Sequence, residues 1–196
     1  MFAMRRTVFA FVLLAAATAS AINTDSHPIR IALLAAPEPW ANRRDAQTAD
    51  LVRNHLRGEL RAMGYDAFIT GDRVFDLGDE GTARADYYLE VTGATDGYPV
   101  GAIGFPIGHN AGAEIGIIVS RVAASVNVYD GRTLGLIRTI DLQKRKTSVA
   151  PTAVGVGGRR FWAALAVPIV EWSQYRAGVQ AVAHDAALQL DQALRH

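Results

Sequence analysis

The sequence contains no cysteine, and this absence narrows the chemistry open to the protein. Without cysteine there are no disulfides, no thiol nucleophile and no thiolate metal ligand, and no cysteine side chain to carry a lipid anchor. A surplus of one charge is also lacking, because 20 basic side chains are balanced by 19 acidic ones. Nucleic-acid-binding proteins usually show a basic surplus on one face, so we expect no nucleic-acid partner. Half of the residues are hydrophobic, which is enough for the core of one domain.

Motifs that carry catalysis or cofactors are absent as well. No serine lies in a Gly-x-Ser-x-Gly pattern, and no His-Glu-x-x-His pattern occurs. The glycine-rich stretch 101–108 lacks the Lys-Ser/Thr pair of a phosphate-binding loop, and 155–158 lacks the strand-to-helix context of a dinucleotide site. The histidines do not fall at metal-ligand spacings; they are His27, His55, His109, His184 and His196. We therefore expect no cofactor and no metal ion, and the sequence names no catalytic residue.

The first 21 residues have the three parts of a secretory signal peptide. Arg5 and Arg6 form a short basic start, an apolar run follows from 7 to 16, and Ala19-Ser20-Ala21 fits a small-x-small cleavage rule. The apolar run is too short to span a membrane, which takes about 20 residues. Cleavage after Ala21 would remove both arginines and no acidic residue, so that 18 of the 20 basic side chains would face 19 acidic ones. We expect an exported protein, with the bacterial periplasm as its compartment and the extracellular space as the alternative.

The clearest pattern lies in residues 117–144, which predict two long strands joined by a turn. Apolar and polar residues alternate on both sides of an Asp-Gly pair, as in half-buried strands. A two-residue loop would pair the apolar face of one strand with the polar face of the other, because a one-residue slip turns every side chain over. A loop of three or five residues, bulged at Gly131 or Gly135, avoids this. One such register sets Val122 opposite Ile140.

The remaining segments complete an α/β (α+β) fold. The stretch 29–35 is a short run that is apolar except for Arg30, as expected of a strand buried on both faces. The predicted order is β-α-β-β-β-β-α, a single mixed sheet of about five strands with the helices packed on one face. Residues 22–196 thus form one α/β domain with loop insertions at 94–116 and 149–172. The other expected elements are strands at 67–70 and 87–92, a helix from about 45 or 48 to 63 ended by Gly64, and a helix from about 175 to 194.

The two insertions are the candidate functional region. Residues 94–116 are rich in glycine, and 149–172 contains a ten-residue apolar run at 161–170. An antiparallel meander would bring both insertions to the same end of the sheet, where they form either a binding surface or a cap that packs on the core. The residues expected to contact a protein partner or a membrane surface are Phe105, His109, Arg159, Arg160, Phe161, Trp162 and Trp172.

Several stretches together resemble a group of bacterial envelope proteins. These stretches are 29–35, 49–65, 85–91, 126–135 and 179–194. The pattern is similar to the amino-terminal domain of TolB, to the curli secretion channel CsgG and to small periplasmic lipoproteins built on the same α/β domain. One departure is Leu134, which separates Thr133 from Gly135 in the turn. The resemblance implies a non-enzymatic assembly or adaptor module in the cell envelope, with an envelope protein as its partner.

Two functions stay open on the sequence alone. The first is an exported, non-enzymatic binding or adaptor protein that contacts its partner through the glycine-rich loop and the Phe161–Trp172 segment. The alternative is an enzyme of unrecognised, hydrolase-like type at the same end of the sheet, with His109, Glu114 or Asp96 as its polar groups. Catalysis by these groups would require them to lie within hydrogen-bonding reach, about 3 Å, of one another.

Overall fold

The computed structural model describes residues 28–36, 43–78, 85–107, 109, 111–156, 159–162 and 166–195. Its strands form one mixed sheet in the order β2-β1-β3-β4-β5-β6. β1 pairs in parallel with both β2 and β3, whereas β3, β4, β5 and β6 pair antiparallel in succession. The elements are β1 Arg30–Leu33, α1 Arg43–Ala62, β2 Asp66–Ile69, the short 3-10 helix η1 Val74–Asp76, β3 Tyr87–Ile107, β4 Ala111–Asp130, β5 Leu136–Val156, β6 Arg159–Trp162 and α2 Ala166–Leu194.

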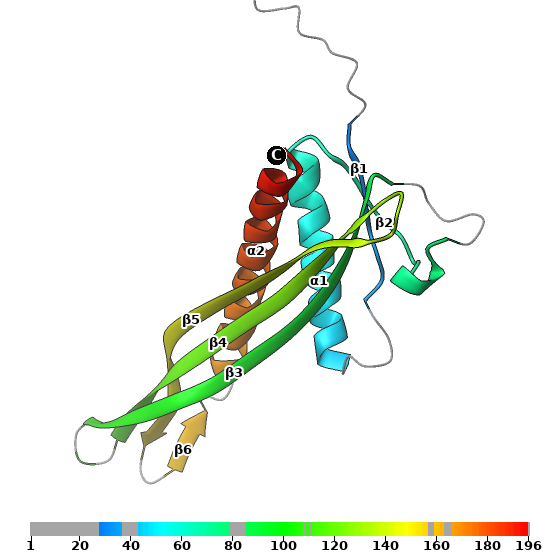
Figure 1. The fold of residues 1–196 in the computed structure, drawn as a ribbon. Helices are drawn as coiled ribbons and strands as arrows, with labels where there is room; N and C mark the ends of the chain where they lie inside the picture. The colour runs from blue at the N-terminus through cyan, green and yellow to red at the C-terminus, as the bar shows by residue number, and fades with distance from the viewer. Residues whose placement is uncertain are drawn as a thin grey trace, which may run out of the picture.

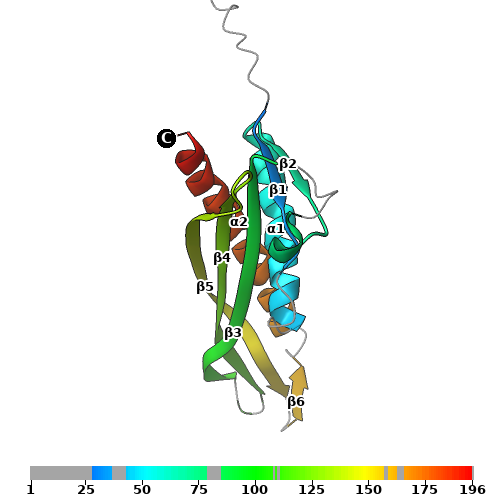
Figure 2. The ribbon, with the colours of Figure 1, turned by 45° about the vertical axis from the view of Figure 1, so that its right-hand side comes forward.

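Both helices cover the same face of the sheet (Figures 1 and 2). The predicted fold class is therefore confirmed: a mixed α/β structure with one sheet and helices on one face. The described residues contain six strands rather than about five, because the short strand β6 follows β5. The three long strands β3, β4 and β5 extend beyond the ends of the helices, and the paired ends of β3 and β4 lie at the tip of this projection (Figure 1).

The core forms where the apolar stripes of the helices meet the sheet. The stripe of α1 recurs at helical spacing, and its buried members are Ala49, Val52, Leu56 and Leu60. α2 buries a similar stripe that includes Val179, Val182, Ala183, Ala186 and Leu190. β1 is buried on both faces, as predicted: Ile31 and Leu33 join the helix-side core, whereas Ala32 and Leu34 join a smaller cluster on the opposite side.

The turn between β4 and β5 has five residues, 131–135, which is one of the two predicted lengths. Asp130 holds this turn, because its Oδ1 accepts hydrogen bonds from the backbone N–H of Arg132 at 2.9 Å and of Thr133 at 2.7 Å. These bonds favour the carboxylate and lower the pKa of Asp130. Leu134 adopts a left-handed conformation, with φ 56°, and packs against the smaller core cluster.

The predicted register of this hairpin is wrong. Val122 lies opposite Lys144, whereas Ile140 lies opposite Val126. The cause is the position of the turn: pairing Val122 with Ile140 centres the turn on Gly131, whereas the observed turn 131–135 is centred on Thr133, which moves each partner by four residues. A bulge next to the turn is a local irregularity, since Val128 pairs with Arg138 and Tyr129 with Leu136, which leaves Ile137 without a β4 partner. The prediction that the apolar faces pair is still correct, because Val126 and Ile140 are both buried on the helix side.

The glycine-rich segment 94–116 is not a loop. It forms the far ends of β3 and β4, which pair continuously down to Ile107 opposite Ala111. Prolines are tolerated because β1 pairs only with Tyr87–Leu89, so the rest of β3 is an edge strand among the described residues. Pro99 also lies next to a bulge, where the register shifts between Pro99 and Gly101. The irregular spacing of glycines hid this strand from an argument based on alternation.

The segment 149–172 is not a loop insertion either. Its first part completes β5, Arg159–Trp162 forms β6, and α2 begins at Ala166 instead of near Tyr175. Pro168 is the third residue of α2, where a missing N–H has no intrahelical partner to lose. Pro168, which would break the middle of a helix, is therefore compatible with the first turn of α2.

Candidate interaction surface

The far end of the sheet carries apolar side chains on the face that the helices leave open. Cross-strand partners in an antiparallel sheet share a face, so the pairs Gly101–Ile117–Val149 and Ile103–Ile115–Pro151 form two rows across three strands. Phe105 follows in the next row, opposite Ala113. Ile103, Phe105 and Val149 are 57%, 48% and 64% exposed. We call the five larger side chains the distal apolar surface: Ile103, Phe105, Ile115, Ile117 and Val149.

Nearer the helices, the same face of the sheet is polar. Asn127 Nδ2 and the Tyr129 hydroxyl both donate to Glu90 Oε2 at 3.0 Å, and Thr139 Oγ1 donates to Asn127 Oδ1 at 2.9 Å. Partial burial and the neighbouring Glu90 carboxylate raise the pKa of Tyr129. Ser125 Oγ donates to Asp141 Oδ1 at 2.5 Å in the next row. Most side chains of this polar region are therefore hydrogen-bonded to one another across three strands.

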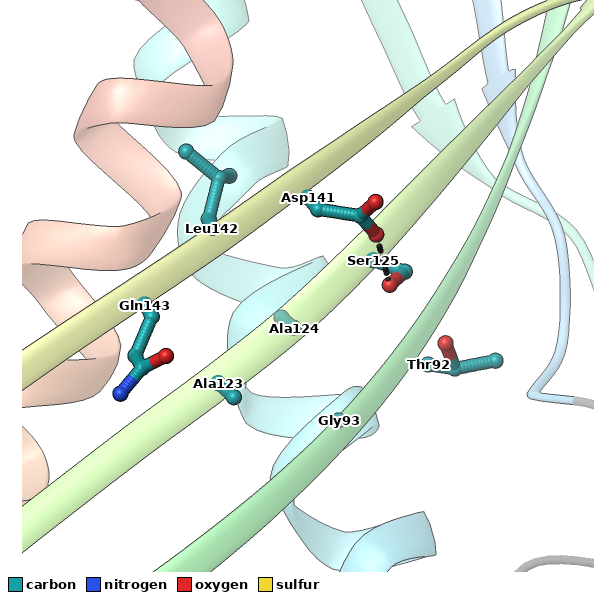
Figure 3. Close-up of a pocket in the computed structure, with 8 residues that line it drawn as sticks. All are labelled: Thr92, Gly93, Ala123, Ala124, Ser125, Asp141, Leu142 and Gln143. Carbon is teal, nitrogen blue, oxygen red and sulfur yellow. Dashed lines mark hydrogen bonds between the residues drawn. The ribbon is translucent and has the colours of Figure 1, made fainter.

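A shallow concavity of about 470 Å³ lies over this polar region. Figure 3 shows Ser125 and Asp141 facing each other across it, with Thr92 on one side and Gln143 on the other. A serine bonded to a carboxylate lacks the histidine base that activates a nucleophile, and no histidine lines this concavity. Among the described residues, no group of three or more acidic or histidine side chains could hold a metal ion. The concavity thus shows polar contacts and no catalytic arrangement.

The predicted contact residues lie at the far end of the sheet, though not on one face. Phe105 belongs to the distal apolar surface, and His109 lies in the β3–β4 turn with an exposed side chain. Trp172 is 59% exposed on α2, which packs on the opposite face. The Arg176 guanidinium lies 4.7 Å from the centre of the Trp172 ring, a cation–π contact. The backbone of β6 carries the other four: Arg159, Arg160, Phe161 and Trp162.

The three polar groups of the enzymatic alternative lie on β3, on β4 and between these two strands. Within it, no hydrogen bond joins His109 to a carboxylate, and Glu114 lies on β4 opposite Gly104. Asp96 lies on β3 opposite Arg121. The histidine that does contact a carboxylate is His184, whose Nδ1 lies 2.9 Å from Glu59 Oε2, and this exposed pair joins the two helices. That position is remote from the concavity on the open face.

Sequence reasoning missed four members of the distal apolar surface. Ile103, Ile115 and Val149 were missed because the segments that hold them were interpreted as loops, and Ile117 began a predicted strand but was not assigned to a surface. A signal was present in Ile115 and Ile117, which lie two residues apart at strand period. Extending the predicted strand back from residue 117 to 111 would have placed Ile115 and Ile117 on one face.

Comparisons with known proteins yield structural likeness only. The chain matches no protein-family model and no curated protein sequence. Among solved structures, it is similar to a Helicobacter pylori protein described as a neuraminyllactose-binding hemagglutinin homologue, with 10% identity, 87% of this chain and 89% of that chain covered, and a TM-score of 0.48. It is also similar to a minor lipoprotein from Acinetobacter baumannii, with 13% identity, 82% and 91% covered, and a TM-score of 0.44.

A third similar structure is a protein from Caulobacter crescentus described as a lipoprotein, with 14% identity, 84% and 86% covered, and a TM-score of 0.39. These neighbours are thus bacterial lipoproteins and a hemagglutinin homologue. Likeness at this level establishes neither a shared family nor a shared function. No helix in the described ranges is long and apolar enough to cross a membrane.

Proposed function

We propose that this protein is an exported, non-enzymatic binding protein of the bacterial envelope, and that a protein partner docks on the distal apolar surface. The observation that carries the proposal is the set of exposed apolar side chains on an uncovered sheet face, led by Val149, Ile103 and Phe105. Contiguous exposed apolar patches on soluble proteins commonly mark interaction sites. Here the patch lies on the distal parts of β3, β4 and β5, in the rows Gly101–Ile117–Val149 and Ile103–Ile115–Pro151.

The surroundings of the patch favour a protein partner. On the same face, the rows that follow the distal apolar surface carry Thr147 and then Arg121 opposite Arg145, and the polar region around Asp141 lies beyond them. An apolar centre with a polar rim is the usual anatomy of a protein–protein interface. Trp172, stacked with Arg176 on the other side of the sheet, offers a second contact of the residue types that dominate binding energy.

Export rests on the sequence. Residues 1–21 have the parts of a signal peptide, and the likeness of five stretches to the TolB amino-terminal domain and to the curli channel supports an envelope location, with the periplasm as the proposed compartment. Because the polar groups near the sheet end do not form a catalytic arrangement in the described residues, binding is the function that we carry forward.

The test is site-specific photo-crosslinking in the native cell, followed by reconstitution. A photo-reactive amino acid placed at Phe105 should crosslink to one defined envelope protein. The same probe at Phe75, which is 95% exposed on η1 far from the sheet tip, should not. The crosslinked protein, once purified, should bind the wild type and lose at least tenfold in affinity with Ile103→Ser plus Val149→Ser.

Two outcomes would contradict this proposal. Equal crosslinking from Phe105 and Phe75 would show that the tip is not a specific contact. Binding of the purified protein to liposomes, lost in the double serine variant, would make the partner a lipid surface instead of a protein. Circular dichroism of each variant checks that the fold is retained.

A further inference from the structure

The outer side of β5 is an unpaired strand edge. β5 is paired with β4 along nearly its whole length, but β6 pairs only with Ala153–Val156 on the other side. No other strand of the described ranges pairs with the outer side of residues 136–152. Figure 2 shows β5 at the margin of the sheet. An unpaired strand presents backbone N–H and C=O groups that can accept a further strand.

The two edges of the projecting sheet differ in how well they could pair. Beyond Leu89, the outer side of β3 carries Pro99, Pro106 and a bulge, which all oppose the addition of a strand. The stretch of β5 from 136 to 150 has neither proline nor glycine, and it contains five β-branched residues: Ile137, Thr139, Ile140, Thr147 and Val149. The β5 edge is therefore the one suited to a further strand.

The β5 edge is also strongly basic. Lys144, Arg145 and Lys146 follow one another at its middle, and Arg138 lies near its start. Lys144 Nζ contacts Asp185 Oδ2 on α2 at 2.5 Å. Among the described residues, Arg138, Arg145 and Lys146 have no carboxylate within ion-pair distance. The one acidic residue of this stretch, Asp141, accepts the hydrogen bond of Ser125.

We propose that the outer side of β5 binds an extended acidic segment of a partner protein, which joins the sheet as an added strand. Backbone hydrogen bonds would supply affinity, and the basic run would select carboxylates at the neighbouring positions. A second copy of this chain fits poorly, because antiparallel pairing about the middle of β5 would bring two Lys144–Lys146 runs against each other. The β5 edge meets the distal apolar surface at Val149, but the basic run Lys144–Lys146 lies outside that surface. Charge reversals in this run therefore test the inference independently of the proposed function.

The first measurement is binding of labelled model peptides by fluorescence anisotropy. The probe is a ten-residue peptide that alternates glutamate and threonine. One control replaces glutamate with lysine, which reverses the charge. A second control replaces threonine with proline, which keeps the charge but fixes φ near −65° and removes backbone donors, so that it cannot form a β-ladder. We expect binding of the glutamate–threonine peptide and at least tenfold weaker binding of both controls.

Two protein variants each reverse two positive charges, one variant on the β5 edge and the other away from it. Arg145→Glu with Lys146→Glu should weaken binding of the acidic peptide at least tenfold. Arg43→Glu with Arg44→Glu makes the same change in net charge at two exposed positions on α1, away from the β5 edge, and it should change affinity by less than about twofold. Hydrogen exchange followed by NMR should show that alternate amides between Leu136 and Thr152 gain protection when the peptide binds.

Three results would overturn the inference. Absence of binding by the acidic peptide would show that the basic residues only protect the edge from aggregation. If the proline-containing acidic peptide bound as tightly as the glutamate–threonine peptide, binding would depend on charge attraction alone and no strand would be added. A dimer in solution whose β5 amides are already protected would show that a second copy occupies the edge.

Discussion

The near and far halves of the long strands behave in opposite ways. In the near half, β3, β4 and β5 bury one face under α1 and α2, with Leu89, Val126 and Ile140 in the core. In the far half, the same strands continue toward the end where β3 and β4 are joined, and their open face carries exposed Ile103 and Val149. One set of strands therefore serves both as a packing scaffold and as a projecting surface. Stability should depend on the near half and recognition on the far half.

The largest expected effect is the loss of a core side chain in the near half. Leu56 is fully buried on α1, so Leu56→Ala should remove about 3–4 kcal/mol from the free energy of unfolding through lost burial and a new cavity. Urea denaturation followed by circular dichroism measures this. A loss below about 1 kcal/mol, the range of surface positions, would mean that the near half is not the stabilising core.

A substitution in the β4–β5 turn should lower the free energy of unfolding almost as much. A Cβ on Gly131 would lie 2.0 Å from the carbonyl oxygen of Ala85 and 2.6 Å from that of Asp86, and these backbone atoms cannot easily move. The N–H of Gly131 also donates to the Asp86 oxygen at 2.8 Å. Gly131→Ala should therefore destabilise the protein by about 2–3 kcal/mol through overpacking.

Gly135 in the same turn provides the matched control. A Cβ there would meet only the Thr133 hydroxyl, at 3.3 Å, which can rotate away. Gly135→Ala should change the urea midpoint far less than Gly131→Ala. Equal midpoints for the two variants would show that the approach of the turn to residues 85–86 does not matter for stability.

A polar contact between the helix ends should have a smaller effect. The Tyr65 hydroxyl donates to Asp191 Oδ1 at 2.7 Å, and Arg195 Nε donates to the same oxygen at 2.7 Å. Tyr65→Phe keeps the ring in the core and removes this bond, which should cost about 1–2 kcal/mol because the acceptor is charged. Thermal unfolding measures the loss, and Tyr87→Phe, a half-buried tyrosine of the same core, serves as a control expected to stay within about 0.5 kcal/mol.

Low pH should lower the stability of the near half, because two carboxylates that are hydrogen-bonded in the folded protein become protonated. Bonds from Thr133 and Arg132 lower the pKa of Asp130, and bonds from Tyr65 and Arg195 lower the pKa of Asp191. Because both folded pKa values lie below the unfolded value of about 3.9, their stabilisation is present above that pH and is lost as the pH falls through the folded pKa.

The measurement is the urea midpoint between pH 6 and pH 3. Asp130→Asn should flatten the fall in stability at the acid end, since one linked proton is removed. Tyr65 has the opposite pH dependence, because burial and Asp191 raise the pKa of its hydroxyl above the unfolded value of about 10. Its contribution to stability is therefore present below pH about 10 and is lost as the pH rises through the raised pKa. An unchanged acid slope in Asp130→Asn would show that the turn carboxylate is not linked to unfolding.

The two halves also differ in how far the sequence could predict them. In the near half, the helical stripe of Ala49 to Leu60, the stop at Gly64 and the doubly buried run 29–35 were all readable, because periodicity reports burial. The predicted hairpin register was wrong because the five-residue turn is centred on Thr133, two residues beyond Gly131, and the Asp-Gly pair does not mark that centre. The placement of Leu134 with φ 56° likewise depends on tertiary packing.

In the far half, the strands were interpreted as loops because glycine and proline normally end a strand. They do not end it here, because β3 is an edge strand whose prolines need no partner on the outer side. Strand order alone placed the residues of the candidate site at one end of the sheet. Its apolar rows could not be predicted without the register that places Ile103 opposite Ile115.

The smallest expected effect on stability comes from a comparison of two isoleucines that lie on opposite faces of the far half. Ile103 is 57% exposed on the open face, so Ile103→Ala should change the free energy of unfolding by less than about 0.5 kcal/mol. Ile118 is fully buried on the helix side of β4, so Ile118→Ala should cost about 2–4 kcal/mol. Both are measured by urea denaturation. Similar losses for the two variants would mean that the open face is packed in solution, and the distal apolar surface would then be core and no longer a candidate for binding a partner.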